Sequence, residues 1–304
     1  MSPRSEFAFE ASKSSPVIVA TDGRDQSDAA VRAGALFGGS PEAWQIVTAS
    51  PLLNAIVPEL DLGITTEATA VLRDQQRRKV EEQVRRVLGS GVPPTVQINT
   101  GDPAFVVAAA AKKGDASLVI CGLGRHRIVD RLLGDETALS IIRNANTPVL
   151  AVPQEFEDAP RSAVVGVDFS EPSVRAAELA LRITRGAATI YLMNVAPRDD
   201  VLSVATGSFR AYEKQVMSEL ESVRRRLDIP ARMHLQAIVR QGDPGSELLR
   251  YAEEVRAELI AVGTSGRGFV ARLLLGSVAT KVVRASPLPV LTVAERDRRS
   301  VQEP

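Results

Sequence analysis

The sequence predicts an α/β protein made of two tandem domains, each a five-stranded parallel sheet with helices on both faces. Three observations predict this fold class. The chain has 304 residues, which is enough for two medium-sized domains. Short apolar segments alternate with longer amphipathic ones, a pattern typical of parallel strands connected by helices. The same order of segments also occurs twice along the chain.

The internal repeat has an offset of about 140 residues. VIVATDG, starting at Val17, matches VVGVDFS, starting at Val164, and a Gly-Asp-Pro sequence begins at both Gly101 and Gly242. A period this long indicates duplicated domains rather than a solenoid. We therefore expect domains at 16–153 and 161–294, a polar linker at 154–160, a flexible tail at 1–15 and a charged tail at 295–304.

The elements of the second domain follow from its apolar segments. Helix starts are expected at Ser170, which is suited to capping, and at Asp243-Pro244, where Asp caps and Pro fits the first turn. The first domain repeats this order, with a helix start at Asp102-Pro103 and a long charged helix at 67–88. For the second domain we expect strands at 163–168, 188–195, 233–239, 259–262 and 290–293, and helices at 172–184, 209–227, 243–257 and from 276.

Composition excludes several classes of protein. Lysine plus arginine balance aspartate plus glutamate at 37 each, so no excess charge favours nucleic acid or a membrane surface as partner. Cys121 is the only cysteine, which excludes an internal disulfide and fits a reducing compartment. No uncharged segment is long enough to span a membrane, and His126 and His234 stand outside any metal-ligand spacing. We expect a cytoplasmic protein without a metal site.

A glycine motif follows the fourth strand of the second domain. It reads Gly263-x2-Gly266-x9-Gly276-Ser277 and lies between an apolar strand and a helix. Glycines let the backbone approach a ligand closely, and the free amides at a helix start attract an anion. The motif therefore predicts a loop that binds a phosphate chain.

This motif resembles the nucleotide-binding motif of the universal stress protein family, G-x2-G-x9-G-[ST], at every defined position. The resemblance implies flavodoxin-like, Rossmann-like domains with strand order 3-2-1-4-5, often paired or in tandem. It also implies that the ligand is an adenine nucleotide, ATP or else AMP or ADP, and it leaves Mg²⁺ open.

Ligands of such sheets bind at the carboxyl ends of the strands, where the strand order reverses. The resemblance implies that Asp168 and Val195 contact the adenosine part of the nucleotide. Arg267 either approaches the phosphates or remains solvated. The residues expected at the phosphates are Gly263, Gly266, Arg267, Gly276, Ser277 and Val278.

The first domain carries an altered version of the site. Its counterparts are Asp22, Gly122, Gly124 and Gly134, but Asp135 stands where the second domain has a serine. Two unit charges about 4 Å apart repel by roughly 4 kcal/mol at an effective dielectric constant near 20. We therefore expect a strong site in the second domain and a weak or lost site in the first, unless Mg²⁺ bridges carboxylate and phosphate.

Other nucleotide motifs are absent or misplaced. A partial dinucleotide fingerprint starts at Gly266, but Lys281 and Arg284 lie where an acidic residue is required, and no Walker sequence occurs. No set of residues for phosphoryl transfer is recognisable, so no catalytic residue is assigned. The sequence favours an ATP-binding universal stress protein with a regulatory or stress-survival role. The alternatives are a slow ATP hydrolase or phosphotransferase, and a scaffold for protein contacts.

The last strand of each domain has an edge that invites pairing. These strands are expected at 149–152 and 290–293. In the family that the sequence resembles, such strands form the dimer contact. The sequence thus predicts an intrachain pseudo-dimer through the last strands, with a homodimer as a further association state.

Overall fold

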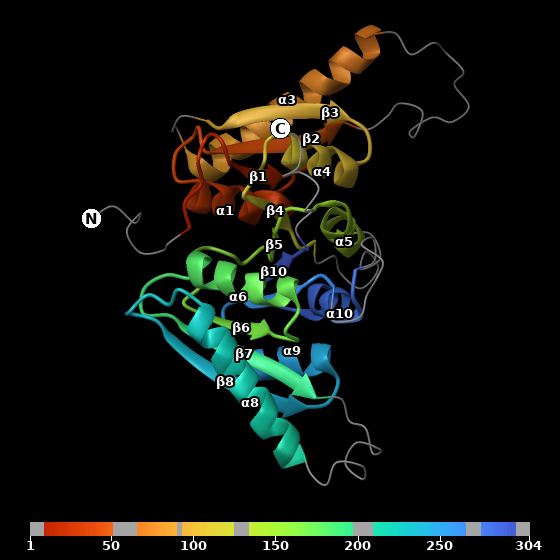
Figure 1. Ribbon diagram of the computed structural model, residues 1–304. Coiled ribbons are helices and arrows are strands. Elements are labelled where there is room, and N and C mark those ends of the chain that lie inside the picture. Colours follow the sequence, from red (N-terminus) through yellow and green to blue (C-terminus); the bar gives the residue numbers. More distant parts are fainter. Residues whose placement is uncertain are drawn as a thin grey trace, which may run out of the picture. The chain divides into compact units, whose positions relative to one another are not determined.

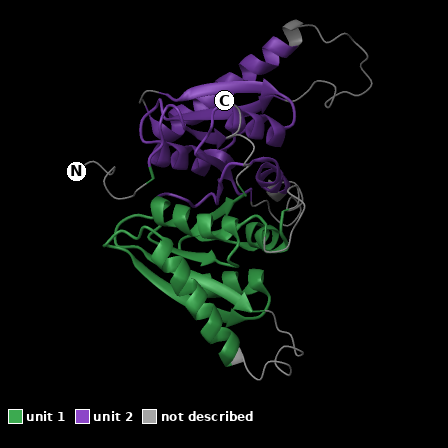
Figure 2. Cartoon of the chain, in the orientation of Figure 1, with its two compact units in different colours: residues 1–9, 159–304 green, residues 10–158 purple. Residues whose placement is uncertain are grey.

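The computed structural model describes residues 9–50, 66–89, 93–124, 134–196, 209–265 and 275–295. They form two compact units (Figure 2). The N-terminal unit spans residues 10–158, and the C-terminal unit comprises Phe9 and the described residues from Ala159 onward. Each unit is an α/β sheet (Figure 1).

The N-terminal unit has a parallel sheet in the order β3-β2-β1-β4-β5. Because crossovers between parallel strands are right-handed, α1 and α3 cover one face, whereas α4 and α5 cover the other. The strands are β1 (Val17–Ala20), β2 (Trp44–Ser50), β3 (Thr95–Thr100), β4 (Leu118–Gly122) and β5 (Val149–Val152). The helices are η2 (Asp25–Ser27), α1 (Asp28–Gly38), α3 (Thr66–Leu88), α4 (Pro103–Lys113) and α5 (Gly134–Asn144).

The C-terminal unit repeats this topology in the order β8-β7-β6-β9-β10. The predicted order 3-2-1-4-5 is therefore confirmed in both units. The strands are β6 (Ser162–Gly166), β7 (Thr189–Ala196), β8 (His234–Gln241), β9 (Ile260–Gly263) and β10 (Val290–Val293). The helices are α6 (Glu171–Ile183), α8 (Phe209–Arg226), α9 (Pro244–Glu254) and α10 (Ser277–Ala285).

Helix caps occur where the sequence predicts them. The Asp243 carboxylate accepts a hydrogen bond from the amide of Ser246 at 2.8 Å, at the start of α9. Asp102 accepts from the first amides of α4, and the Ser170 hydroxyl accepts from the amide of Ser173 at the start of α6. Each cap fixes the residue at which a helix begins, a few residues after the carboxyl end of the preceding strand.

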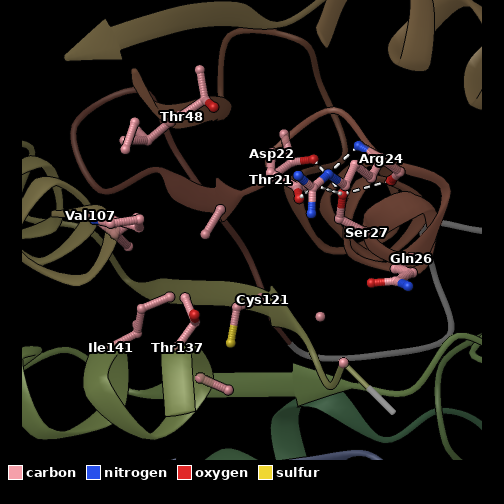
Figure 3. Close-up of a pocket in the computed structure, with 17 residues that line it drawn as sticks. Thr21, Asp22, Arg24, Gln26, Ser27, Thr48, Val107, Cys121, Thr137 and Ile141 are labelled. Atoms are coloured by element: carbon pink, nitrogen blue, oxygen red, sulfur yellow. Dashed lines mark hydrogen bonds and ion pairs between the residues drawn. The ribbon is translucent and has the colours of Figure 1, made fainter. Parts of the chain in front are cut away.

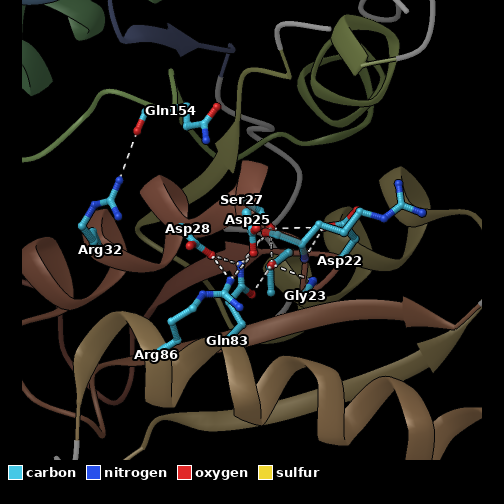
Figure 4. Close-up of polar contacts among 11 residues, drawn as sticks. Asp22, Gly23, Asp25, Ser27, Asp28, Arg32, Gln83, Arg86 and Gln154 are labelled. Atoms are coloured by element: carbon cyan, nitrogen blue, oxygen red, sulfur yellow. Dashed lines mark hydrogen bonds and ion pairs between the residues drawn. The ribbon is translucent and has the colours of Figure 1, made fainter.

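Two segments outside the regular elements are also packed. Arg32 of α1 donates to the carbonyl oxygen of Gln154 at 3.1 Å (Figure 4) and to that of Phe156 at 3.3 Å. The Phe156 ring lies against Phe37. The start of the predicted linker is thus fixed on the N-terminal unit. Phe9, within the stretch predicted as a tail, is only 4% exposed and lies under the Arg182 guanidinium of α6. That stretch therefore contains a residue of a folded unit.

The helices within the described ranges include none that is both long and apolar enough to cross a membrane.

Candidate functional site

Two loops meet at the carboxyl end of the C-terminal sheet. One follows β6 and the other follows β9, and these strands are neighbours at the point where the strand order reverses. The Ser170 hydroxyl lies 3.5 Å from the carbonyl oxygen of Ser265, so the loops are in contact. This is the position at which an open α/β sheet binds ligands.

Asp168 lies in the loop after β6, half-buried at this edge. Its carboxylate accepts hydrogen bonds from the amide and hydroxyl of Ser170 at 3.1 and 2.5 Å. The next residue, Phe169, has φ of 64°, a left-handed conformation that bulky side chains rarely adopt. Gly23 has φ of 78° at the matching place in the N-terminal unit. Both loops therefore make the same sharp turn directly after the aspartate.

The glycine loop is closed at its base by a backbone hydrogen bond. The amide of Gly276 donates to the carbonyl oxygen of Thr264 at 2.7 Å, and a Cβ on Gly276 would lie 3.1 Å from that oxygen. A Cβ on Gly263 would lie 2.9 Å from Pro172 Cβ and 3.0 Å from the amide nitrogen of Ser173. Both glycines are thus required by close packing rather than by a left-handed backbone.

Helix α10 begins directly after this closure. Gly276 is its N-cap residue and supplies no side-chain acceptor to the first turn. Ser277 is exposed and Val278 is half-buried at its first two positions. The remaining predicted loop residues, Gly266 and Arg267, lie outside the described part of the chain. The structure therefore brings Asp168, Gly263, Gly276 and Ser277 to one edge of the sheet.

Val195 is half-buried near the end of β7 and pairs with Arg240 of β8. Its neighbour Asn194 is buried and was not singled out from the sequence. The Asn194 amide donates to the carbonyl oxygen of Val167 at 2.7 Å and accepts from the hydroxyl of Tyr212 at 3.0 Å. Asn194 thereby fixes the end of β7 to the end of β6. An amide side chain within the otherwise apolar run from Leu192 to Ala196 is the sequence signal that identifies it.

The N-terminal unit contains a cavity of about 310 Å³ at the matching edge (Figure 3). Its lining comes from the carboxyl ends of β1, β2 and β4, from η2 and from helices α4 and α5. Three of the predicted residues of this unit, Asp22, Gly122 and Gly124, line it. The fourth, Gly134, is the first residue of α5.

One wall of this cavity is apolar. Val107, Cys121, Ala138 and Ile141 form it, and each is at most 3% exposed. Burial raises the pKa of the Cys121 thiol to about 12, so that the sulphur is neutral at physiological pH. This wall offers contact with carbon and neutral sulphur. Thr137 of α5 also lines this side, whereas the Asp22 carboxylate and the other lining hydroxyl groups lie on the β1 and β2 side.

The polar side is organised around Asp22 (Figure 4). The Asp22 carboxylate accepts from the amide of Arg24 at 3.0 Å and from the hydroxyl of Ser27 at 3.1 Å, and it forms an ion pair with Arg24 Nε at 3.4 Å. Gln76 of α3 donates to the carbonyl oxygen of Asp22 at 3.1 Å and to the hydroxyl of Thr48 at 2.9 Å. The long helix therefore holds the aspartate loop against β2.

Gln83 lies about two helical turns after Gln76 on α3 and is fully buried. It accepts from the hydroxyl of Thr21 and donates to the hydroxyl of Ser27, to the carbonyl oxygen of Arg24 and to the carboxylate of Asp28. Gln83 was not predicted from the sequence. Its signal is its place on the apolar stripe of the helix, between the buried Val80 and Val84.

The fold and these loops define a class of protein, namely tandem doubly wound α/β domains with a glycine loop where the strand order reverses. The model of the universal stress protein family matches residues 14–153 and 160–294, and the chain belongs to that family, in its tandem form.

The relatives support this assignment. The chain is 28% identical over 261 residues to universal stress protein Rv2623 of Mycobacterium tuberculosis, which covers 80% of this chain and 86% of the relative. It is 24% identical over 295 residues to a universal stress protein of Mycolicibacterium smegmatis, with 92% and 97% covered. A crystal structure of a universal stress protein from Archaeoglobus fulgidus shares the fold, with a TM-score of 0.62, 20% identity and 93% and 97% of the two chains covered.

Proposed function

We propose that the C-terminal unit binds an adenine nucleotide, ATP or else AMP or ADP, and that the chain couples this binding to a regulatory or stress-survival role in the cytoplasm. One observation carries the proposal. The hydrogen bond between Gly276 and Thr264 closes the loop directly before α10, and the N-cap residue Gly276 has no side chain that could accept from the first amides of the helix. The amides of the first turn are then available to an anion, which the helix dipole also favours.

The neighbouring groups suit the rest of a nucleotide. The Ser277 hydroxyl is exposed at the first position of α10 and is a donor for a phosphate oxygen. Asp168 stands on the adjoining loop as an acceptor for ribose hydroxyls, and Val195 is the penultimate residue of the next strand. A nucleotide bound here would extend from the α10 start toward the end of β7. Mg²⁺ would accompany ATP as a counter-ion for its phosphates.

The test places a negative charge at the start of α10. Ser277→Asp reproduces the residue that the N-terminal unit carries at the matching position, Asp135. A carboxylate about 4 Å from a phosphate is repelled by roughly 4 kcal/mol at an effective dielectric constant near 20, so ATP affinity should fall by at least 100-fold in titration calorimetry. Ser218→Asp, an exposed site on α8, is the control for added charge.

Affinity that is unchanged in Ser277→Asp would remove the phosphate assignment. The two alternatives from the sequence have their own outcomes. Phosphate release that depends on Mg²⁺ and disappears in Ser277→Asp indicates a slow hydrolase or phosphotransferase. A wild-type chain that binds no adenine nucleotide indicates a scaffold for protein contacts. The pairing of the last strands within the chain, and a homodimer, belong to the same proposal. Light scattering tests the homodimer through the molar mass of the particle.

A further inference from the structure

The N-terminal cavity differs in chemistry from a phosphate-binding crevice. Its described lining carries one formal negative charge, on Asp22, and one positive charge, on Arg24, and these two side chains are paired with each other. Cys121 is neutral, because burial holds its thiol protonated. The lining as described therefore has no net charge to attract a polyphosphate.

The loop sequences of the two units also differ in formal charge, and the loop of the N-terminal unit is the less positive of the two. Gly122 to Glu136 contains three arginines and three acidic residues, so it is formally neutral. The matching segment, Gly263 to Val278, contains two arginines and no acidic residue. Moreover, Asp135 and Glu136 occupy the first turn of α5. A carboxylate in the first turn of a helix interacts favourably with the helix dipole, so this helix start has an anionic residue of its own in Glu136.

The remaining features favour a ligand with a flat apolar part and hydroxyl groups. The wall made by Val107, Cys121 and Ile141 is apolar, as expected for contact with a ring. A carboxylate has about four acceptor positions, and the described contacts of Asp22 use three of them. The Asp22 side chain is 54% exposed, so a ligand hydroxyl has access to it. The volume of about 310 Å³ is at the lower end for small-molecule sites.

We propose that the cavity of the N-terminal unit binds an uncharged nucleoside, with the base against the apolar wall and the sugar hydroxyls donating to Asp22. The choice of a nucleoside rests on the proposed function of the C-terminal unit, since the two crevices occupy the same place in duplicated sheets. The difference in charge would then give the two units different ligands. The C-terminal unit would bind a nucleotide, and the N-terminal unit would bind the corresponding nucleoside without phosphate.

The aromatic residues allow each unit to be followed separately. Trp44 is the only tryptophan of the chain, and it is buried in the N-terminal unit. The three tyrosines, Tyr191, Tyr212 and Tyr251, all lie in the C-terminal unit. Selective excitation of tryptophan thus reports the unfolding of one unit, and tyrosine emission reports that of the other.

The experiment is thermal unfolding of the full chain with adenosine or with ATP. Adenosine at a large excess should raise the Trp44-reported midpoint by about 5 °C or more, because a ligand that binds only the native state stabilises it by mass action. ATP should leave that midpoint unchanged. An equal shift of the Trp44 transition with ATP, or no shift with adenosine, overturns the proposal.

Two variants sharpen the result. Asp22→Ala should abolish the effect of adenosine on Trp44, whereas Asp115→Ala, an exposed aspartate of the same unit, should retain it. Asp135→Ser should allow ATP to raise the Trp44 midpoint, because it removes the carboxylate at the α5 start. ATP without effect on Asp135→Ser contradicts the role given to that charge.

A second measurement uses Cys121, the only cysteine and part of the cavity wall. Bound adenosine should slow its alkylation at least tenfold, as counted by mass spectrometry, and an unchanged rate overturns the proposal even if the variants misfold. The two proposals fail separately. Loss of the tyrosine-reported ATP shift removes the nucleotide site of the C-terminal unit, while the Trp44 response to adenosine decides the nucleoside site.

Discussion

Gln83 shows how one buried amide organises the loop that carries Asp22. The side chain is fully buried in a helix whose sequence is dominated by charged residues. It satisfies groups on Thr21, Arg24 and Ser27, so the turn after β1 and the helix are fixed to each other (Figure 4). Polar networks of this kind stabilise strongly only when every member has a partner.

We predict that Gln83→Ala lowers the free energy of unfolding of the N-terminal unit by about 2–3 kcal/mol, because it leaves buried hydroxyl and carbonyl groups without their partner. Urea unfolding followed by Trp44 fluorescence measures this loss. Gln75→Ala, an exposed glutamine on the same helix, should change it by less than about 0.5 kcal/mol. Equal effects of the two substitutions would show that the network contributes nothing.

At the level of secondary-structure elements, the two helices beside the glycine loop are joined by an ion pair. Lys281 of α10 and Asp243, the N-cap residue of α9, lie 2.6 Å apart. In the N-terminal unit the matching position on α5 is occupied by Leu139, so the pair is particular to the C-terminal unit. The hydrogen bond from Lys281, followed by that from the amide of Ser246, lowers the pKa of Asp243 from 3.8 to about 2.

This shift predicts a pH dependence. Since the pKa of Asp243 is lower in the folded state, its stabilisation is present above pH 3.8 and is lost as the pH falls through about 2. Both side chains are about half exposed, so the pair contributes less than about 1 kcal/mol. We expect Lys281→Gln to be less stable than wild type at pH 6, with the difference vanishing toward pH 2.

Tyrosine-detected urea unfolding at several pH values measures this difference. Lys214→Gln, at an exposed position of α8, is the matched control and should show no dependence on pH. A deficit of Lys281→Gln that stays constant between pH 6 and pH 2 would mean that the lysine acts through something other than the Asp243 charge.

The elements were predictable from the sequence to a large extent. Apolar segments, the repeat and the caps at Ser170 and Asp243 depend on neighbours along the chain, and the structure has the strands and helices close to the expected positions. The first strand of the C-terminal unit is an exception. It was expected to reach Asp168 but ends at Gly166, because the chain turns sharply at Phe169.

The site was predictable only in part, because its remaining parts depend on contacts between distant segments. Gly276 could be assigned from the motif, yet its contact with Thr264 is a tertiary feature. The roles of Gln83 and Asn194 depend on the loops that they reach, which no local pattern specifies. The cavity in the N-terminal unit likewise arises from six separate elements. The sequence motif thus indicated the edge of the sheet at which we propose a ligand site, but not which side chains support the loops.

On the scale of the whole molecule, the C-terminal unit contains a residue that is distant from it in the sequence. The C-terminal unit includes Phe9, which precedes the entire N-terminal unit in the chain. The Phe9 ring is 4% exposed, and the Arg182 guanidinium lies 5.6 Å from its centroid. A single aromatic residue near the chain start therefore takes part in the core of the sequence-distant half.

We predict that Phe9→Ala destabilises the C-terminal unit by about 3 kcal/mol, since removing a buried phenylalanine loses its burial and leaves a cavity. The loss should appear in the tyrosine-reported urea transition and leave the Trp44-reported transition unchanged. Phe105→Ala provides the control, because the Phe105 ring on α4 is 64% exposed and its removal should alter neither transition by more than about 0.5 kcal/mol. If Phe9→Ala shifts the Trp44 transition alone, residue 9 stabilises the unit that follows it in the sequence, and the assignment of Phe9 to the C-terminal unit is wrong.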